Sequence, residues 1–262
     1  MRVMRVMWAM RARWVTEWRH LIAAFAYFTR VPMPAIGSDA PALAAAGRYF
    51  PLVGLFVGGC GALVLLLAAC LWPPTIAAGL ALATTALLTG ALHEDGLADC
   101  CDGLGGAFSR DDVLRIMRDS RIGAFGAIGL VLALGLRWQA IAALPTPLAA
   151  WVVLVAHPAS RSAAISLVWA LPYARESGKA QAITAGFGTV ARSVAVLTGL
   201  PWLFWLDWRC GVAMLLTLLA LRAALLRWFK RRIGGYTGDC LGLAQQLAEL
   251  SIYLVALAWY AR

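Results

Sequence analysis

Charged residues are scarce in this sequence, and acidic residues are the scarcest. Only 14% of the 262 residues are charged, whereas 62% are hydrophobic. In soluble globular chains the apolar share is nearer one half, so this chain has too little polar surface to cover itself in water. The composition therefore excludes an ordinary soluble domain and indicates a lipid bilayer as the solvent.

Patterns of several other protein classes are also missing. The six cysteines form no CxxC pair and no Cys/His spacing typical of a metal site, so we expect them to be buried small hydrophobic residues. The N-terminus has neither the apolar core nor the small-residue cleavage site of a secretory signal. The net charge of +10 comes from arginines in short clusters between apolar runs, and not from one basic face with interleaved aromatics. Nucleic acid is therefore not expected as a partner.

Long apolar runs, in contrast, are abundant. A helix needs about 20 residues to cross a hydrocarbon core about 30 Å thick. Seven runs approach that length, namely 50–71, 75–92, 122–144, 148–171, 190–206, 211–226 and 240–260. They predict an all-α fold, a polytopic integral membrane bundle of about seven transmembrane helices (six to eight), in one membrane-embedded domain over residues 1–262.

Residues 1–30 precede these runs and have a different composition. They mix arginines with tryptophans and end in a short apolar stretch, 21–28, that cannot cross a membrane alone. The arginines are Arg2, Arg5, Arg11, Arg13 and Arg19, and the tryptophans are Trp8, Trp14 and Trp18. This mixture predicts an interfacial amphipathic helix in contact with the lipid bilayer.

The distribution of Arg and Lys predicts the orientation in the membrane. With seven spans and a cytoplasmic N-terminus, inner connections should be rich in Arg and Lys, and outer ones poor. The expected inner connections carry Arg110, Arg115, Arg118, Arg121, Arg175, Lys179, Arg227, Lys230, Arg231 and Arg232. The expected outer turns, near Pro73, Pro145 and Trp208, contain only Arg209. We therefore expect a multi-pass protein of a bacterial cytoplasmic (inner) membrane whose polar motifs face the cytoplasm.

Seven of the thirteen acidic residues lie within the 26 positions 94–119. On a continuous helix, Asp95, Asp99 and Asp102 follow at i, i+4 and i+7 and share one face, where like charges repel. Each would cost roughly 2.5–3.5 kcal/mol at a helix centre in the membrane, so a compensating cation is implied. Mg²⁺ fits, because it prefers oxygen ligands and is held by a few carboxylates plus waters and substrate phosphates. We therefore expect these three aspartates to bind Mg²⁺.

The same segment contains residues with two interpretations. Asp111 and Asp112 follow Ser109 and are better explained as first-turn acids of a helix than as metal ligands. Glycines at positions 103, 105 and 106 would let the backbone approach a phosphate, but glycine is also common packing material in membrane helices.

Two basic or glycine-rich motifs follow downstream. Arg118 and Arg121 suit either phosphate oxygens or anionic lipid, whereas Arg115 is better explained as a lipid anchor. The motif GGYTGD at 234–239 combines a flexible turn with Asp239 at a membrane boundary, on the side expected for the acidic segment.

Several polar residues lie inside apolar runs and are expected to face the bundle interior or a polar cavity, because they would be costly against lipid. They are Arg137, His157, Arg161, Gln245, Gln246 and Glu249. For the last three, hydrogen bonding between helices is the favoured role.

These segments together resemble the cobalamin synthase family, the adenosylcobinamide-GDP ribazoletransferases of the vitamin B12 pathway. Four stretches carry the resemblance, in the order of the family and over most of the chain. They are FTRVPMP at 28–34, HEDGLAD at 93–99 with DGLGG at 102–106, IMRDSRIG at 116–123, and GGYTGD at 234–239. PYAR at 172–175 also looks like the family. The Arg/Trp-rich N-terminus and the pair Cys100 and Cys101 depart from it, without touching a proposed ligand.

The resemblance implies a phosphotransferase that joins adenosylcobinamide-GDP and α-ribazole, or α-ribazole 5′-phosphate, to give adenosylcobalamin, or its 5′-phosphate, and GMP. Mg²⁺ between carboxylates and diphosphate would supply the main electrostatic stabilisation. Asp239 is assigned to a second metal contact or to the attacking hydroxyl, and His93 or Glu94 to the catalytic base. The residues assigned to substrate binding are Arg118, Arg121, Gly103, Gly105, Gly106 and Tyr236.

Two other functions remain open. CDP-alcohol phosphotransferases and membrane prenyltransferases also hold Mg²⁺ and a diphosphate with aspartates at helical spacing. A transporter is suggested by the intramembrane Arg137, His157 and Gln246. Transporters often consist of two related halves, however, and the acidic segment is not repeated elsewhere in this sequence. A homo-oligomer is also compatible with the sequence.

Overall fold

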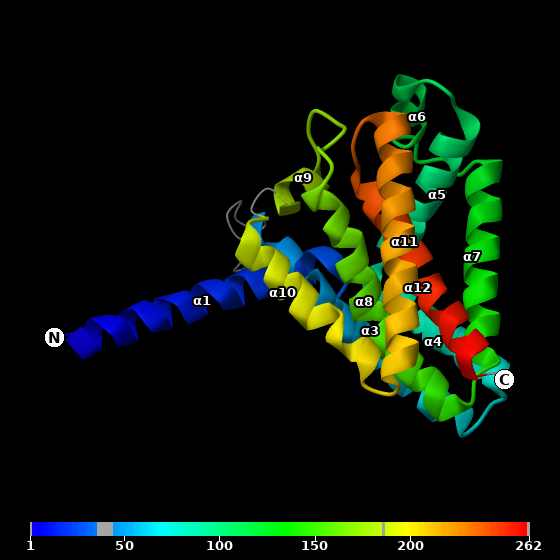
Figure 1. Cartoon of the computed structure of the whole chain (residues 1–262), viewed down its shortest axis with the longest axis horizontal. Coiled ribbons are helices and arrows are strands. Elements are labelled where there is room, and N and C mark those ends of the chain that lie inside the picture. The colour runs from blue at the N-terminus through cyan, green and yellow to red at the C-terminus, as the bar shows by residue number, and fades with distance from the viewer. Residues whose placement is uncertain (1, 36–43, 185–186, 261–262) are drawn as a thin grey trace.

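The computed structural model describes residues 2–35, 44–184 and 187–260, and the regular elements in these ranges are helices joined by short loops (Figure 1). The α-helices are α1 Arg2–Phe28, α3 Phe50–Ala69, α4 Pro74–Thr89, α5 Leu92–Gly106, α6 Arg110–Ile116, α7 Ala124–Ala142, α8 Thr146–Ile165, α9 Lys179–Thr184, α10 Thr189–Gly199, α11 Trp208–Ile233 and α12 Gly238–Tyr260. Short 3₁₀ helices are η1 Gly47–Tyr49, η2 Ser166–Trp169 and η3 Pro201–Phe204. The only β-type pairing in the described residues is an isolated bridge between Tyr173 and Tyr236. The all-α membrane fold is thus confirmed.

The number of helices that can cross a membrane is lower than the seven apolar runs predict. Among the described residues, five helices are long and apolar enough, and α4 with α5 makes up to six if this bent pair is one span. The run 190–206 forms the short α10 and η3 instead of a full-length helix. Hydropathy identifies apolar segments, but it does not show where a segment breaks.

The break in the run 75–92 lies just before the acidic segment. Gly90 and Ala91 adopt left-handed backbone conformations, with φ of 64° and 55°, and α5 leaves α4 at an angle of 89°. Glycine takes this conformation readily, and the Ala91 N–H donates to the Ala86 carbonyl, which closes the end of α4. The aspartates therefore lie on a separate helix of 15 residues and not on the continuation of a straight span.

Two helices form the centre of the bundle. In the most apolar stretches of α8 and α12, 78% and 67% of residues are buried, against 28% in both α7 and α11. Helix α8 packs against α3, and α12 packs against α5 and α8. Helices α7 and α11 keep large apolar side chains exposed, as expected for faces turned to lipid.

The connections expected to be poor in Arg and Lys and those expected to be rich in them lie at opposite ends of the bundle. The turns α3–α4, α7–α8 and α10–α11 lie at the lower end in Figure 1. Helix α6, the segment after α8 and the α11–α12 turn lie at the upper end. The motifs at 116–123, 172–175 and 234–239 are thus at one end, as the distribution of Arg and Lys predicts.

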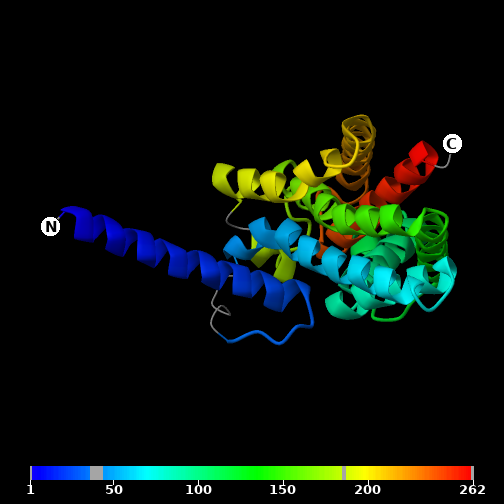
Figure 2. The same cartoon turned by 90° about the horizontal axis from the view of Figure 1, so that it is seen from below.

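Helix α1 extends away from the bundle (Figures 1 and 2). Its bundle end is fixed by Glu17, which accepts hydrogen bonds from Arg48 and Tyr49. Trp8, Trp14 and Trp18 are all exposed. The side chains of Arg2, Arg5 and Arg13 lie outside the part that the structure describes.

Candidate functional site

A cavity of about 270 Å³ opens where the bundle end of α1 meets α3, α5, α8 and α12. Its polar lining comes from His93 and Asp95 on α5, Tyr173 and Arg175 on the segment after η2, and Asp239 on α12. The remaining lining is apolar, with Phe28 and Phe50 on one wall. Motifs far apart in the sequence thus meet around one hollow.

A close crossing of α5 and α12 brings the acidic motifs together. A Cβ atom on Gly96 would lie 3.0 Å from both the Cα and the carbonyl oxygen of Asp239, and 3.2 Å from the Cα of Gly242. Glycine at 96 and 242 therefore allows the two backbones to touch. The contact places Asp95 and Asp99 beside Asp239.

Asp99 is the centre of the negative charge in this region. Its carboxylate is half-buried and interacts electrostatically with the carboxylates of Asp239, Asp95 and Asp102. Asp95 is exposed at the cavity. The predicted shared face of α5 is therefore present, with Asp239 added from the opposite end of the chain.

Asp102 has a different environment from its two neighbours. Its carboxylate accepts hydrogen bonds of 2.8 Å from the backbone N–H groups of Gly123 and Gly126, at the start of α7. An anionic acceptor there stabilises the positive end of the helix dipole. Sequence spacing gave Asp102 the same role as Asp95 and Asp99, but its carboxylate also fixes α7 to α5.

Arg175 is a site residue that the sequence analysis did not assign. The bridge between Tyr173 and Tyr236 joins the PYAR and GGYTGD motifs, through Ala174 N–H to the Tyr236 carbonyl and Tyr236 N–H to the Pro172 carbonyl. Arg175 then reaches Asp239, with 2.6 Å between Nη2 and Oδ2. In the sequence, the resemblance of PYAR to the family is the feature that points to Arg175.

Gly235 permits this bridge. A Cβ atom there would lie 2.3 Å from the Pro172 carbonyl oxygen, so a larger residue would separate the two motifs. Tyr236 itself is 3% exposed and packs edge-on against Tyr173, with 5.4 Å between the ring centroids. It lies behind Tyr173, which lines the cavity, and burial raises the pKa of the Tyr173 hydroxyl.

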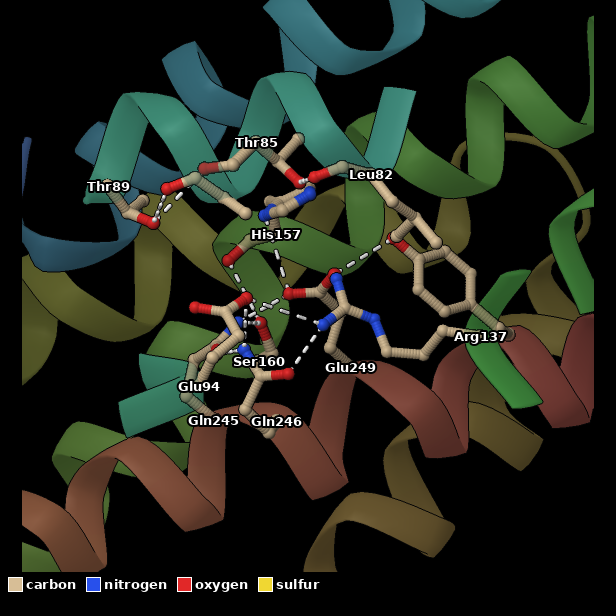
Figure 3. A network of polar contacts seen from close by, with 12 residues as sticks. Leu82, Thr85, Thr89, Glu94, Arg137, His157, Ser160, Gln245, Gln246 and Glu249 are labelled. Atoms are coloured by element: carbon tan, nitrogen blue, oxygen red, sulfur yellow. Dashed lines mark hydrogen bonds and ion pairs between the residues drawn. The ribbon is translucent and has the colours of Figure 1, made fainter. Parts of the chain in front are cut away.

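Glu94 points into the bundle and not into the cavity. It belongs to a buried polar network between α5, α7, α8 and α12, which Figure 3 shows from close by. The network comprises Glu94, Arg137, His157, Ser160, Arg161, Gln245, Gln246, Glu249 and Tyr253. Two carboxylates thus face two guanidinium groups within the membrane-spanning region, which confirms that these polar residues face inward. The bonds between helices also agree with the structural role favoured for the two glutamines and Glu249.

His93 lies between the network and the cavity. Its ring is 4% exposed and stacks on Phe50, with 5.4 Å between ring centroids. Among the described residues, its buried Nε2 atom has no hydrogen-bond partner. Of the two candidate bases, only His93 lines the cavity.

A second hollow of about 400 Å³ lies beside the first, and four of its eight lining residues are arginines. Its side chains come from α6 and the segments after α6 and η2, and Arg175 lines both hollows. Its charged residues are Arg110, Asp111, Arg115, Arg118, Arg175 and Glu176, and we call this hollow the basic cleft.

Arg121 lies outside both hollows. It pairs with Asp119, with 2.7 Å between Nη2 and Oδ2, and this guanidinium lowers the pKa of Asp119 to about 2. The first-turn interpretation of Asp111 and Asp112 is confirmed, because both lie in the first turn of α6 and Ser109 accepts a hydrogen bond from Asp112 N–H.

The glycines assigned to substrate lie at the other end of α5. Gly103 packs against Met117, and Gly105 packs against Phe125, whereas a Cβ atom on Gly106 would meet only Ile116 Cδ1, at 4.0 Å. None of the three lines the cavity or the basic cleft. Packing, the second of the two interpretations, describes Gly103 and Gly105.

The carboxylates suit a magnesium ion. Among the described residues, no three His, Cys, Asp or Glu side chains form a group that could hold a metal by themselves. Mg²⁺ commonly takes only one or two carboxylates together with waters and substrate phosphates. Asp95 at the cavity, with Asp99 and Asp239 beside it, provides hard oxygen donors of this kind. The residues therefore fit a site that a phosphate-bearing substrate completes.

Comparison with known proteins agrees with this assembly of motifs. Residues 20–257 match the family model described as Cobalamin-5-phosphate synthase. The chain is 49% identical over 247 residues to an adenosylcobinamide-GDP ribazoletransferase of Ralstonia nicotianae, covering 92% of this chain and 95% of that one. It is 44% identical over 259 residues to the corresponding protein of Leptothrix cholodnii, covering 94% and 98%. No solved structure matches. The chain belongs to the cobalamin-5-phosphate synthase family.

Proposed function

We propose that this protein is a transferase of cobalamin biosynthesis that joins adenosylcobinamide-GDP to α-ribazole or α-ribazole 5′-phosphate and releases GMP. A ribose hydroxyl oxygen of the acceptor bonds to the phosphorus attached to cobinamide. The bond from that phosphorus to the bridging oxygen breaks, and the bridging oxygen leaves with GMP. The meeting of Asp95, Asp239, Arg175 and His93 around one cavity, in a chain of this family, carries the proposal.

Binding of the diphosphate is assigned to Arg175 and the neighbouring carboxylates. Mg²⁺ bound there would neutralise diphosphate charge and stabilise the leaving group. Asp95 and Asp99 would hold the ion, and Asp239, now paired with Arg175, would be a further oxygen donor to it. The Arg175 guanidinium is then available to phosphate oxygens, for which its planar shape is suited.

Removal of the proton from the attacking ribose hydroxyl is assigned to His93. Its Nε2 atom is buried, without a partner among the described residues, and belongs to a ring in the cavity wall. Stacking on Phe50 holds this ring in place. A fixed acceptor at the substrate is what general base catalysis requires.

The site is proposed to face the cytoplasm of a bacterial inner membrane. Support comes from the basic cleft and the arginines at the end of α11, which lie at the end of the bundle that carries the motifs. Positively charged connections remain on the cytoplasmic side during insertion. The exposed apolar faces of α7 and α11 support lipid as their surroundings.

Product analysis of purified protein tests the proposal. Detergent-purified protein with adenosylcobinamide-GDP, either acceptor and Mg²⁺ should release GMP in step with the corrinoid product, and EDTA should stop the release. Asp99→Asn should lower the rate about a hundredfold or more with unchanged thermal unfolding, because the residue holds charge at the reacting group. Asp207→Asn, at the opposite end of the bundle and outside both the cavity and the basic cleft, is the matched control, because asparagine also caps a helix.

Two results would contradict the assignment. The first is that no GMP is released with both substrates and Mg²⁺ present. The second is that the protein converts a CDP-alcohol or prenyl diphosphate instead, which would retain the acidic site but change the substrate.

A further inference from the structure

The basic cleft contains more positive charge than its hydrogen bonds and ion pairs with neighbouring residues involve. Arg110 donates to the carbonyl oxygens of Ile233 and Ala174, and thereby ties α6 to the motifs of the cavity. Arg115 pairs with Asp112 at 2.9 Å. Each of these arginines therefore has a structural partner.

Arg118 is different. It is exposed and lines the cleft, and among the described residues its side chain makes no hydrogen bond or ion pair. Its charge acts on Tyr173, a residue of the cavity wall. A guanidinium in a concave surface with no partner is suited to an anion that arrives from solution.

The cleft and the cavity share a wall. Arg175 lines both, and its Nη2 atom contacts Asp239 on the cavity side and lies 3.4 Å from the Met117 carbonyl, next to Arg118 in sequence. A ligand whose reacting hydroxyl lies in the cavity can therefore place a second charged group in the cleft.

We infer that the basic cleft binds the phosphate monoester of a nucleotide acceptor, with Arg118 as the residue that selects phosphorylated over unphosphorylated acceptor. This inference rests on the proposed function, since it concerns the second substrate of the same site. The 5′-phosphate of the acceptor lies against Arg118 while the attacking ribose hydroxyl lies near Asp239 and His93.

The two acceptors provide the test. In Arg118→Gln, the ratio of kcat/KM for α-ribazole 5′-phosphate to that for α-ribazole should fall about tenfold, the usual effect of one hydrogen bond to a charged group. Arg118→Lys, which keeps the charge, should retain part of the preference. Arg231→Gln, an exposed arginine of α11 that does not line the cleft, should leave the ratio unchanged. An unchanged ratio in Arg118→Gln, or an equal loss with both acceptors, would overturn the inference.

Equilibrium binding separates this inference from the proposed reaction. In the Asp99→Asn background, titration with α-ribazole 5′-phosphate should give a Kd about tenfold weaker when Arg118 is also replaced by Gln. This measurement needs no turnover, so it tests the cleft even if GMP release is not found. Addition of phosphatidylglycerol should not weaken the binding. If it does so through Arg118, a lipid phosphate is the natural occupant and the inference fails.

Discussion

Glu249 is the residue on which the buried charges of the bundle most depend. It accepts hydrogen bonds from Arg137, Gln245 and Tyr253 and lies 3.4 Å from His157. Removing one partner of a buried ion pair costs roughly 3–5 kcal/mol, because the other charge is left without compensation. Glu249→Gln should therefore unfold at a clearly lower temperature in detergent, measured with a thiol-reactive dye that reports exposure of the buried Cys100 and Cys240.

The control for this variant is Asp111→Asn, whose carboxylate is 93% exposed. It should unfold at the temperature of the unchanged protein, since exposed ion pairs contribute little. Equal unfolding temperatures for the Glu249 and Asp111 variants would show that the network does not stabilise the bundle.

Single residues were predicted from the sequence where a local rule decides them. Ser109 and the acids behind it follow helix capping, and the inward orientation of Arg137 and Glu249 follows the cost of charge in lipid. Glu94 and Asp95 are neighbours on α5, and only the position of α12 decides which of them faces the cavity. Arg175 reaches the site through pairing between distant loops, for which a single sequence contains no spacing rule.

At the scale of elements, the crossing of α5 and α12 aligns the acidic groups. A methyl group on Gly96 would meet backbone atoms of Asp239 at 3.0 Å, and backbone cannot rotate away as a side chain does. Gly96→Ala should therefore move Asp239 by a few tenths of an ångström and lower kcat by about tenfold to a hundredfold, since small misplacements at a reacting centre are costly. The rate of GMP release at saturating substrate measures the effect.

Gly135→Ala is the matched control, because a Cβ atom at this position of α7 has nothing within 4 Å. Alanine also favours the helix over glycine, so this variant should be at least as stable and fully active. Activity of Gly96→Ala equal to that of Gly135→Ala would refute the role of the crossing.

Helices were predicted well where the apolar run is unbroken, as in α3, α7, α8 and α12. The sequence does not reveal that the run 75–92 bends at its end. The two residues at the bend are a glycine and an alanine, both of which are compatible with a membrane helix. Their left-handed conformations depend on tertiary packing. Arg30, for example, donates its backbone N–H to the Leu88 carbonyl near this bend.

For the whole molecule, the two ends of the bundle differ in charge, and this difference predicts the orientation. Cys70 is exposed beside the α3–α4 turn, at the end that is poor in Arg and Lys. A membrane-impermeant maleimide should therefore label Cys70 in intact spheroplasts, and Cys70→Ser should remove that labelling. In the Cys70→Ser background, the further substitution Ser109→Cys, at an exposed position, should give a thiol that reacts only after permeabilisation.

The reverse pattern would place the cavity and the basic cleft outside the cell. It would also separate the site from nucleotide substrates, which are made in the cytoplasm and do not cross a bilayer unaided. Insertion keeps arginines on the cytoplasmic side, and the same arginines form a cleft suited to phosphate. Ser109 begins α6, the helix whose arginines line the cleft, so labelling there reports the side on which substrates must arrive.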